Sequence, residues 1–303
     1  MNLGIKVDVD TYQGMKEGVP NLLNILKKMK IKASFFIAMG PDNSGKAIKR
    51  IFRKGFLNKM LRTKAPAAYG IKTLLYGTLL KPPLIGRNFT DLFLEIKDSG
   101  HEVGIHGYDH VKWQDELDYM SYNEFKEEYT KAVDEYIRIF KTRPRSSAAP
   151  AWKCNEISFS VEDENNLLYH SDTRGEYPCF IKMSSSTFKT LEIPSTLPTL
   201  DEIYGLEGLS ENKIIPYYLN QLKKDRLNVL TIHAEMEGRW KKELFEEFLK
   251  SVSELNCDFV TLEEIAGKII DSKNNIPVCE SSQMVIPGRS GKVCCQIVKK
   301  QTF

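Results

Sequence analysis

Short runs of apolar and β-branched residues alternate along the chain with longer segments in which apolar residues recur at helical spacing. In the first of these segments, Val19, Leu22 and Leu26 form one apolar stripe, and lysines occupy the other face. Alternation of strands with helices predicts a mostly parallel sheet, and therefore an α/β barrel or a doubly wound sheet. The predicted strands are 3–10, 32–39, 102–106, 167–172, 228–234 and 257–262, and the predicted helices are 17–30, 89–99, 121–140, 155–166, 211–224, 241–255 and 261–271.

The alternating pattern extends to about residue 271, which indicates a single barrel-like domain over 1–271. A chain of 303 residues is long enough for such a barrel, since this architecture commonly takes roughly 250 residues. Residues 43–90 interrupt the alternation and are predicted to form an insertion. Residues 272–303 are richer in Pro, Gly, Ser and Cys, so we expect an irregular C-terminal tail packed on the barrel.

Ionisable residues lie at the carboxyl ends of several predicted strands. Asp8 and Asp10 close the first strand, and His106 closes the third. Asp172 and His233 end two later strands. Because the carboxyl ends of parallel strands meet at one rim, where the loops converge, these residues are predicted to form one site.

Three residues at this rim have the composition of a metal site. Asp10, His106 and His110 offer one carboxylate oxygen and two imidazole nitrogens, and three protein ligands with an open position are typical of a catalytic divalent metal, most naturally zinc. The spacing of the two histidines lets both rings face one ion if the turn between them is helical. A bound metal would acidify its water and polarise a carbonyl group. Taken alone, such a pair of histidines is more often structural.

Asp8 and His233 are the candidate acid–base residues. Asp8 lies two residues before Asp10 on the same strand face and could take a proton from the attacking water. His233 could protonate a departing amine, with Asp172 orienting its ring. Both aspartates have ordinary alternatives, because a DxD at a strand end often forms a turn, a cap or a sugar-nucleotide site, and Asp172 could simply pair with Arg174 in a loop. The remaining histidines, which we expect to be structural, are His101 and His170.

Several stretches carry a family resemblance. The motifs "DVD", "HGYDH" and "TIHA" resemble those of the polysaccharide deacetylase (NodB-like) family, which implies a distorted (β/α) barrel. Further stretches, including "SDTRG", "IPSTLPTLDE" and "TIHAEMEG", resemble the branch of that family that removes the formyl group from 4-deoxy-4-formamido-L-arabinose carried on undecaprenyl phosphate. This resemblance covers nearly the whole chain. It implies release of formate and of a free amino sugar for lipid A modification and resistance to cationic peptides such as polymyxin.

The resemblance also implies a cofactor and roles for individual residues. The cofactor would be one divalent metal ion, zinc or alternatively manganese or cobalt. The general base would be Asp8, the metal ligands Asp10, His106 and His110, the general acid His233, and the partners that tune them Asp172 or Arg174. After Trp152, where the family typically has arginine, this chain has Lys153, which keeps the charge but loses the bidentate fork. If that position touches a phosphate or the base, lysine holds it less firmly; if it lies on the surface, nothing changes.

The predicted insertion is basic and amphipathic. Between Asp42 and Asp91 there are eleven Lys or Arg residues and no acid, whereas acids outnumber bases in the rest of the chain. Apolar residues alternate with these cations as in an interfacial helix, so we expect the segment to bind an anionic membrane surface, where a polyprenyl-phosphate sugar lies. Alternatively, its apolar residues cover the barrel; nucleic acid is not expected as a partner, since no groove-reading motif is present. The candidate substrate or membrane contacts are Lys49, Arg50, Phe52, Arg53, Lys54, Phe56, Trp152 and Lys153.

The sequence also bears on location. The stretch "MNLGIKVDVD" enters a strand directly with no signal peptide before it, and no apolar run approaches the roughly 18 residues of a membrane span. Six cysteines without metal-finger spacing suit a reducing compartment. We therefore expect a peripheral protein on the cytoplasmic side of the bacterial inner membrane, and the sequence does not tell which protein partners it has. Two rival functions stay open, an N-acetyl-sugar deacetylase of the same family and a non-catalytic barrel that binds a sugar lipid.

Overall fold

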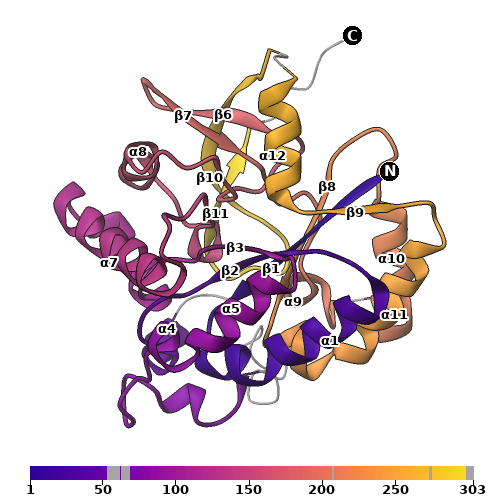
Figure 1. Cartoon of the computed structure of the whole chain (residues 1–303), viewed down its shortest axis with the longest axis horizontal. Helices are drawn as coiled ribbons and strands as arrows, with labels where there is room; N and C mark the ends of the chain where they lie inside the picture. Colours follow the sequence, from indigo (N-terminus) through magenta and orange to yellow (C-terminus); the bar gives the residue numbers. More distant parts are fainter. Residues whose placement is uncertain (53–61, 63–68, 207, 273–274, 298–303) are drawn as a thin grey trace.

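The fold is built on one large, mostly parallel sheet with helices packed around it (Figure 1). The computed structural model describes residues 1–52, 62, 69–206, 208–272 and 275–297. β1 (Asn2–Val9) pairs in parallel with β8 (Asn228–His233) on one side and with β2 (Ser34–Ile37) on the other. Beyond β2 the order is β3 (Glu102–Ile105), β4 (Ser146–Ser147), β5 (Tyr169–His170), β7 (Ser186–Glu192), β6 (Cys179–Met183), β10 (Val278–Val285) and β11 (Lys292–Gln296), and β9 (Asp258–Val260) pairs with β1.

The sheet curves into a barrel that strand pairing alone does not close. β8 through β7 run parallel, whereas β6 is antiparallel to β7. Between β7 and β8, the backbone N–H groups of Thr196 and Leu197 both donate to the carbonyl of Val229 at 3.1 Å. The N–H of Val229 in turn donates to Thr196 Oγ1 at 2.8 Å. An irregular segment therefore fills the gap, and the barrel is distorted.

The centre of the sheet is buried on both faces, as expected for a parallel sheet covered by helices. Ile5 and Val7 of β1 are fully buried on one face, and Lys6 and Asp8 are buried on the other. The face that carries Lys6 and Asp8 points into the barrel toward the rim, because alternate residues of a strand face opposite sides. The strands that sequence alternation predicted as 3–10, 102–106 and 228–234 correspond to β1, β3 and β8, so the rim residues start from rigid positions.

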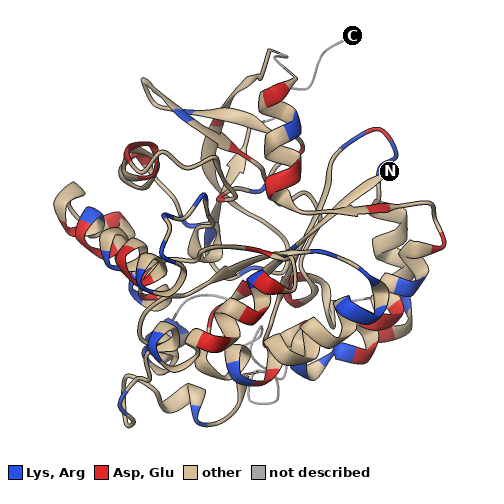
Figure 2. Ribbon diagram, viewed as in Figure 1, with Lys and Arg blue, Asp and Glu red and all other residues tan. Residues whose placement is uncertain are grey.

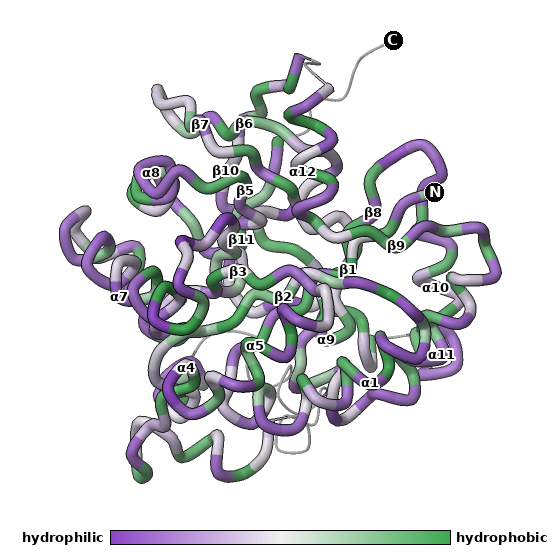
Figure 3. Tube along the Cα trace, in the orientation of Figure 1, coloured by the Kyte–Doolittle hydropathy of each residue, from purple (hydrophilic) through white to green (hydrophobic). Residues whose placement is uncertain are grey.

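Each predicted helix is present, and apolar residues of each are buried. In Figure 3, hydrophilic and hydrophobic turns alternate along α1 and α11. Local capping begins several helices: the N–H of Ser121 donates to Glu124 Oε2 at 2.8 Å at the start of α7, a capping box. The helices are α1 (Val19–Met29), α4 (Ile85–Asn88), α5 (Thr90–Asp98), α6 (His110–Glu116), α7 (Tyr122–Phe140), α8 (Glu156–Glu164), α9 (Leu200–Ile203), α10 (Ile214–Gln221), α11 (Lys242–Ser253) and α12 (Leu262–Asp271).

The C-terminal region differs from the irregular tail expected over 272–303. In its described part, β10 and β11 form an antiparallel hairpin, and β10 extends the main sheet by pairing with β6. The signal for this hairpin was hidden because the buried positions of β10 are filled by small residues, Cys279 and Ser281, rather than by large apolar ones. The expectation of irregular structure was wrong here.

The described part of the insertion wraps the carboxyl end of the barrel. It contains two 3₁₀ helices, η2 (Ser44–Phe52) and η3 (Thr73–Leu75), and the short α4. Its own described residues include basic side chains and no acidic ones (Figure 2), although Arg50 and Arg87 pair with Asp115 and Glu135 of α6 and α7. The side chains of Ile48, Ile71 and Leu79 are 61%, 72% and 81% exposed. Among the described residues, no helix combines the length and apolar character needed to cross a membrane.

Candidate active site

The polar strand ends meet at one cavity, on the rim formed by the carboxyl ends of β1, β3 and β8. The barrel contributes the residues that were predicted to bind the metal and move protons. The insertion and the turn of the C-terminal hairpin contribute the other parts of the cavity wall. The main residues lining the cavity are Asp8, Asp10, His106, His110, Trp152, Asp201 and His233 from the barrel and its loops, Ser44, Arg50, Tyr69 and Thr73 from the insertion, and Arg289 and Ser290 from the hairpin turn.

Asp10, His106 and His110 are close enough to hold one metal ion. Asp10 Oδ1 lies 3.3 Å from His106 Nε2 and 3.5 Å from His110 Nε2. Ligand atoms about 2.1 Å from a tetrahedral ion are about 3.4 Å apart, so the residues fit zinc or a similar divalent ion. Asp10 Oδ1 is buried and accepts no hydrogen bond from the described residues, which is the state of an oxygen that coordinates a cation.

The two histidines reach this position by different routes. His106 follows β3 directly, whereas His110 begins α6, which Asp109 caps by accepting hydrogen bonds from the N–H groups of Val111 and Lys112 at 3.1 and 3.0 Å. Gly107 turns the chain between them with a φ of +72°. The condition that the intervening turn be helical was therefore wrong, although the rings do converge.

The protonation of Asp10 and His110 suits a metal. Burial lowers the pKa of His106, but the neighbouring Asp8 and Asp10 outweigh it and bring the pKa above its ordinary value, so an ion would displace a proton from this ring. His106 Nδ1 lies 2.8 Å from the carbonyl oxygen of Ala148, an arrangement that fixes the ring and turns Nε2 toward Asp10. Burial lowers the pKa of His110 to about 4, so this imidazole is neutral near pH 7. Burial raises the pKa of Asp10, but the neighbouring His110 and His106 outweigh it and bring the pKa below its ordinary value. A carboxylate and a neutral imidazole are the forms that bind metals.

Asp8 lies beside the triad and is held by a lysine. Asp8 Oδ2 is 3.9 Å from His106 Nε2 and 3.7 Å from Lys6 Nζ. Lys6 is fully buried and donates a hydrogen bond to the carbonyl of Ser171 at 2.8 Å. Asp8 Oδ1 accepts no hydrogen bond from the described residues, so this oxygen can receive a proton. Sequence reasoning missed Lys6, although a lysine on the same strand face as Asp8, within an apolar run, is a signal.

His233 ends β8 next to Asp8 in the strand register, and it lines the same cavity. Its Nδ1 lies 4.0 Å from Asp201 Oδ1, and its backbone N–H donates to Glu237 Oε2 at 2.9 Å. We expected Asp172 to orient this ring, and that expectation was wrong, because the neighbouring carboxylate is Asp201. Asp201 lies within the stretch "IPSTLPTLDE", so the motif was noticed but its aspartate was not assigned.

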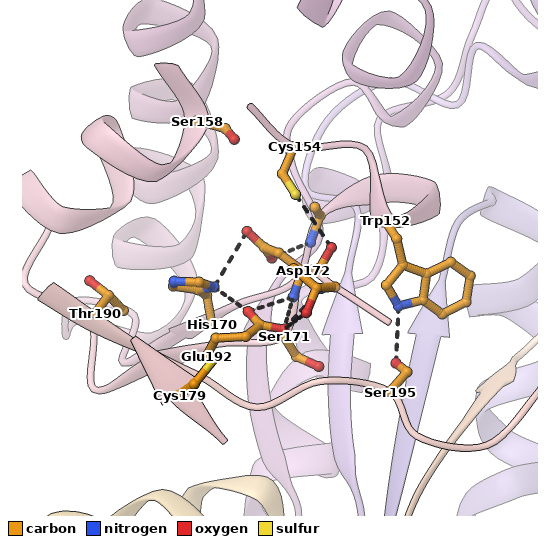
Figure 4. A network of polar contacts seen from close by, with 12 residues as sticks. Trp152, Cys154, Ser158, His170, Ser171, Asp172, Cys179, Thr190, Glu192 and Ser195 are labelled. Carbon is orange, nitrogen blue, oxygen red and sulfur yellow. Dashed lines mark hydrogen bonds and ion pairs between the residues drawn. The ribbon is translucent and has the colours of Figure 1, made fainter. Parts of the chain in front are cut away.

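Asp172 belongs to a buried polar network behind the site (Figure 4). Its Oδ1 accepts a hydrogen bond from the N–H of Ala149 at 2.7 Å, and its Oδ2 lies 3.6 Å from His170 Nδ1. His170 Nδ1 is also paired with Glu192 at 2.5 Å. All three side chains are fully buried, and burial raises the pKa of Asp172. His170 is therefore structural, as expected, and Asp172 positions the backbone at Ala149.

The same network contains a second group that could hold a metal, made of Glu162, His170 and Asp172. Burial raises the pKa of Glu162 well above its ordinary range, so this side chain is a neutral acid and a poor ligand. The network supports the turn that follows Ala149, where Ala151 and Trp152 have φ angles of +56° and +52°. Residues other than glycine adopt such angles only when their surroundings enforce them. Its role here is that of a scaffold.

Trp152 lines the cavity and is backed by two guanidinium groups. Those of Arg174 and Arg289 lie 5.0 and 4.8 Å from its ring centroid. Arg174 also pairs with Glu202 at 3.1 Å, and it is not among the residues that line the cavity. Lys153 points away and pairs with Asp118, which favours the surface alternative for this position.

The candidate contacts within the insertion separate into two kinds. Arg50 is buried, with its Nε 2.9 Å from Asp115 Oδ1, and it lines the cavity and not the outer surface. Lys49 is exposed. The remaining candidates, namely the side chain of Phe52 and residues Arg53, Lys54 and Phe56, lie outside the described part of the structure, as does most of the expected amphipathic helix.

Comparison with known proteins places this geometry in a family. The family model described as polysaccharide deacetylase matches residues 8–169, which include Asp8 and the three candidate ligands. The chain belongs to the polysaccharide deacetylase family. The predicted family resemblance and the predicted distorted barrel are thereby confirmed.

Curated members of this polysaccharide deacetylase family align over nearly the whole chain. Over 290 residues it is 36% identical to the probable 4-deoxy-4-formamido-L-arabinose-phosphoundecaprenol deformylase ArnD of Shewanella sediminis, covering 95% of this chain and 92% of that protein. Over 288 residues it is 35% identical to the protein of the same description from Wigglesworthia glossinidia brevipalpis, covering 93% and 98%. The resemblance to this branch is confirmed, and it extends well beyond residue 169.

Solved structures share the polysaccharide deacetylase fold at low identity. A probable polysaccharide deacetylase from Pseudomonas aeruginosa PAO1 has a TM-score of 0.62 at 15% identity, covering 90% of this chain and 92% of that one. PuuE allantoinase has a TM-score of 0.62 at 13%, covering 90% and 91%. A pseudoenzyme from Bacillus anthracis has a TM-score of 0.53 at 14%, covering 88% and 65%. Proteins with this fold thus include enzymes of different activity and a pseudoenzyme, so the function of this chain must be argued from its site.

Proposed function

We propose that this protein is a divalent-metal-dependent hydrolase that removes the formyl group from 4-deoxy-4-formamido-L-arabinose carried on undecaprenyl phosphate. The observation that carries the proposal is the meeting of Asp8 and His233 with the Asp10, His106 and His110 triad in one cavity. Identity of 36% to a protein described as this deformylase supports the substrate. The products would be formate and a free amino sugar for lipid A modification and polymyxin resistance.

The triad would hold the ion, with zinc the best fit and manganese or cobalt as alternatives. When bound, the ion would polarise the formamide carbonyl and lower the pKa of the attacking water. Hydrogen bonding to Ala148 keeps the His106 ring in place for this purpose. The rest of the chemistry belongs to the chain's own residues.

Asp8 and His233 would move the protons. Asp8 Oδ1 takes one proton from the attacking water, while Lys6 holds Oδ2 on the other side of the carboxylate. The new C–O bond gives a tetrahedral intermediate, and protonated His233 then donates its proton to the sugar nitrogen as the C–N bond breaks. Asp201 beside His233 Nδ1 stabilises the charged ring.

A backbone donor for the developing oxyanion is expected near Ala149–Trp152. The N–H of Ala149 already donates to Asp172, and that of Trp152 donates to the carbonyl of Ala149 at 3.1 Å. Pro150 has no N–H. We therefore assign this role to the N–H of Ala151, a residue that lines the cavity.

The site would work at a membrane surface. Exposed Ile48, Ile71 and Leu79 stand among exposed lysines of the acid-free insertion, a combination that favours an anionic bilayer by about 1 kcal/mol for each nearby cation. We propose the cytoplasmic side of the inner membrane, in agreement with six cysteines that are all free thiols. We also keep the predicted division of the chain, with a barrel over 1–271, an insertion over 43–90 and a tail over 272–303. The hairpin within this tail is assigned to the barrel.

The test is formate release from the lipid-linked formamido sugar in vesicles, with the N-acetyl sugar assayed in parallel. We expect release from the formyl substrate only, loss of activity with a chelator, and recovery with zinc, manganese or cobalt. Asp8→Asn should bind metal without activity, and His106→Ala should lose both, whereas the exposed Asp98→Asn should change neither. Preference for the acetyl substrate would favour a deacetylase. Binding of the sugar lipid without turnover would favour a non-catalytic barrel.

A further inference from the structure

The insertion forms part of the wall of the cavity that contains the metal triad. η2 and η3 pack against each other and contribute Ser44, Arg50 and Thr73 to the cavity lining. The triad, Asp8 and His233 all come from the barrel strands and their loops. A sugar whose nitrogen lies at the triad is therefore bounded in part by residues of the insertion.

Arg50 brings a positive charge into this wall. It is only 9% exposed, and its Nε donates to Asp115 Oδ1 and Oδ2 at 2.9 and 3.1 Å. Asp115 belongs to α6, the helix that begins with His110, so the guanidinium is anchored to the same element as a metal ligand. An anchored guanidinium is a preferred partner for phosphate, which it can bind through a bidentate fork.

Thr73 brings a hydroxyl that has no partner within the described structure. It is 1% exposed, it lines the same cavity, and its Oγ1 makes no hydrogen bond to any described residue. Burial of a hydroxyl without a hydrogen bond costs free energy, which a ligand would recover. Thr73 is therefore an independent indication that something polar binds at this wall.

The chemistry of the proposed substrate identifies that group. The formamide is on C4 and the phosphate on C1, at opposite sides of the sugar ring, so the phosphate must lie across the cavity from the triad. The lipid continues from the phosphate and needs an apolar path outward. Exposed Ile48 precedes Arg50 by two residues, and exposed Ile71 precedes Thr73 by two, so both wall residues stand next to apolar side chains at the surface.

We propose that Arg50 and Thr73 form a subsite that binds the phosphate group of the lipid-linked sugar, and this assignment rests on the proposed function. Arg50 neutralises the phosphate charge, and the Thr73 hydroxyl donates a hydrogen bond to one of its oxygens. The subsite makes the enzyme prefer a sugar phosphodiester to the same formamido sugar without a phosphate.

The experiment compares two substrates in detergent micelles free of phospholipid, the lipid-linked phosphodiester and the neutral methyl glycoside of the same sugar. The measured quantity is the ratio of their kcat/KM values. Thr73→Val keeps the shape of the side chain and should lower this ratio about ten- to a hundred-fold, the range for a hydrogen bond to a charged group. Arg50→Lys, which keeps the charge but loses the fork, should also lower it. The exposed Thr78→Val and Lys28→Gln are matched controls that should leave the ratio unchanged.

Stability separates a binding role from a structural one. Because Thr73→Val removes a buried hydroxyl without a partner, the variant should melt at the same or a higher temperature while the ratio falls. An unchanged ratio in Thr73→Val and Arg50→Lys would overturn the subsite even if both substrates are still deformylated.

A second arm separates the substrate's phosphate from that of the membrane. Binding of the unaltered protein and the two variants to vesicles with anionic phospholipid is measured without substrate. If the variants lose vesicle binding but keep the ratio in micelles, the site binds membrane phospholipid, and the substrate assignment is overturned. Absence of turnover of either substrate by the unaltered protein would instead refute the proposed function.

Discussion

Glu237 is a buried acid whose charge should make the stability of the protein depend on pH. It is 4% exposed, and its Oε2 accepts the backbone N–H of His233 at 2.9 Å. Burial raises its pKa from 4.5 to about 8, with a smaller contribution from Asp201. Replacement by glutamine keeps the shape and an oxygen that can accept the same N–H, but it removes the ionisation.

The sign and size of the effect follow from proton linkage. Between pH 4.5 and about 8 the folded protein keeps a proton on Glu237 that the unfolded chain has released, so the free energy of unfolding falls as the pH rises through this window. At about 1.4 kcal/mol per unit of pKa shift, the whole shift corresponds to at most about 5 kcal/mol. The glutamine variant does not lose this stability. Its buried NH₂ group can cost about 1–3 kcal/mol at every pH, so the change with pH is diagnostic and the offset is not.

The measurement is urea unfolding of both proteins followed by tryptophan fluorescence at several values between pH 5 and pH 8.5. We expect the stability of Glu237→Gln relative to the unaltered protein to rise by several kcal/mol across this range. Other buried acids, such as Glu162, titrate in both proteins and cancel in the difference. The exposed Glu243→Gln should give a flat difference. A flat difference for Glu237→Gln as well would refute the reasoning.

Three further predictions concern the residues that hold the site together. Lys6→Met should destabilise the protein by about 3–5 kcal/mol and abolish formate release, because it leaves buried Asp8 without its cation, and Lys6→Arg should restore part of both. Gly14→Ala should weaken metal binding in titration calorimetry, because the new Cβ would lie 2.0 Å from Glu235 Oε1, the oxygen that accepts the N–H of Asp10. The control is Gly267→Ala, because a Cβ there would have no other atom within 4 Å. Asp201→Asn should lower kcat more than tenfold at unchanged metal content, and full activity would exclude it as the partner of His233.

The strand ends that carry chemistry could be predicted because they obey a local rule. Asp8, Asp10, His106 and His233 each follow or end a short apolar run, and parallel topology brings such ends to one rim. The sequence analysis missed Lys6 and Asp201 because their roles depend on contacts with residues that are distant in the chain. The spacing of hydrophobic residues gives no information about such contacts. Asp172 also ends a predicted strand, but it lies deeper in the protein. Its carboxylate accepts a hydrogen bond from the backbone N–H of Ala149 instead of contacting the reacting groups.

The insertion shows a different limit of sequence reasoning. Its positive charge and its apolar residues correctly marked it as a segment distinct from the barrel. The order of apolar and basic residues could not show which cations face outward. Arg50 and Lys49 are neighbours in sequence, yet one is buried against Asp115 and the other is exposed. That division depends on how η2 packs on α6, a tertiary contact that a stripe of alternating residues leaves open. The hairpin of β10 and β11 was missed for a related reason, since small buried residues give no hydrophobic alternation.

That hairpin has a consequence for what the C-terminal strands add to the site. Its turn brings Arg289 to within 3.9 Å of Asp201 and against Trp152, whereas the metal triad is made entirely by Asp10, His106 and His110. The grouping of the three ligands therefore does not involve the hairpin, but the positive charge beside Asp201 does. Displacement of β10 and β11 from the sheet should leave an ion in place while it changes the charge next to His233.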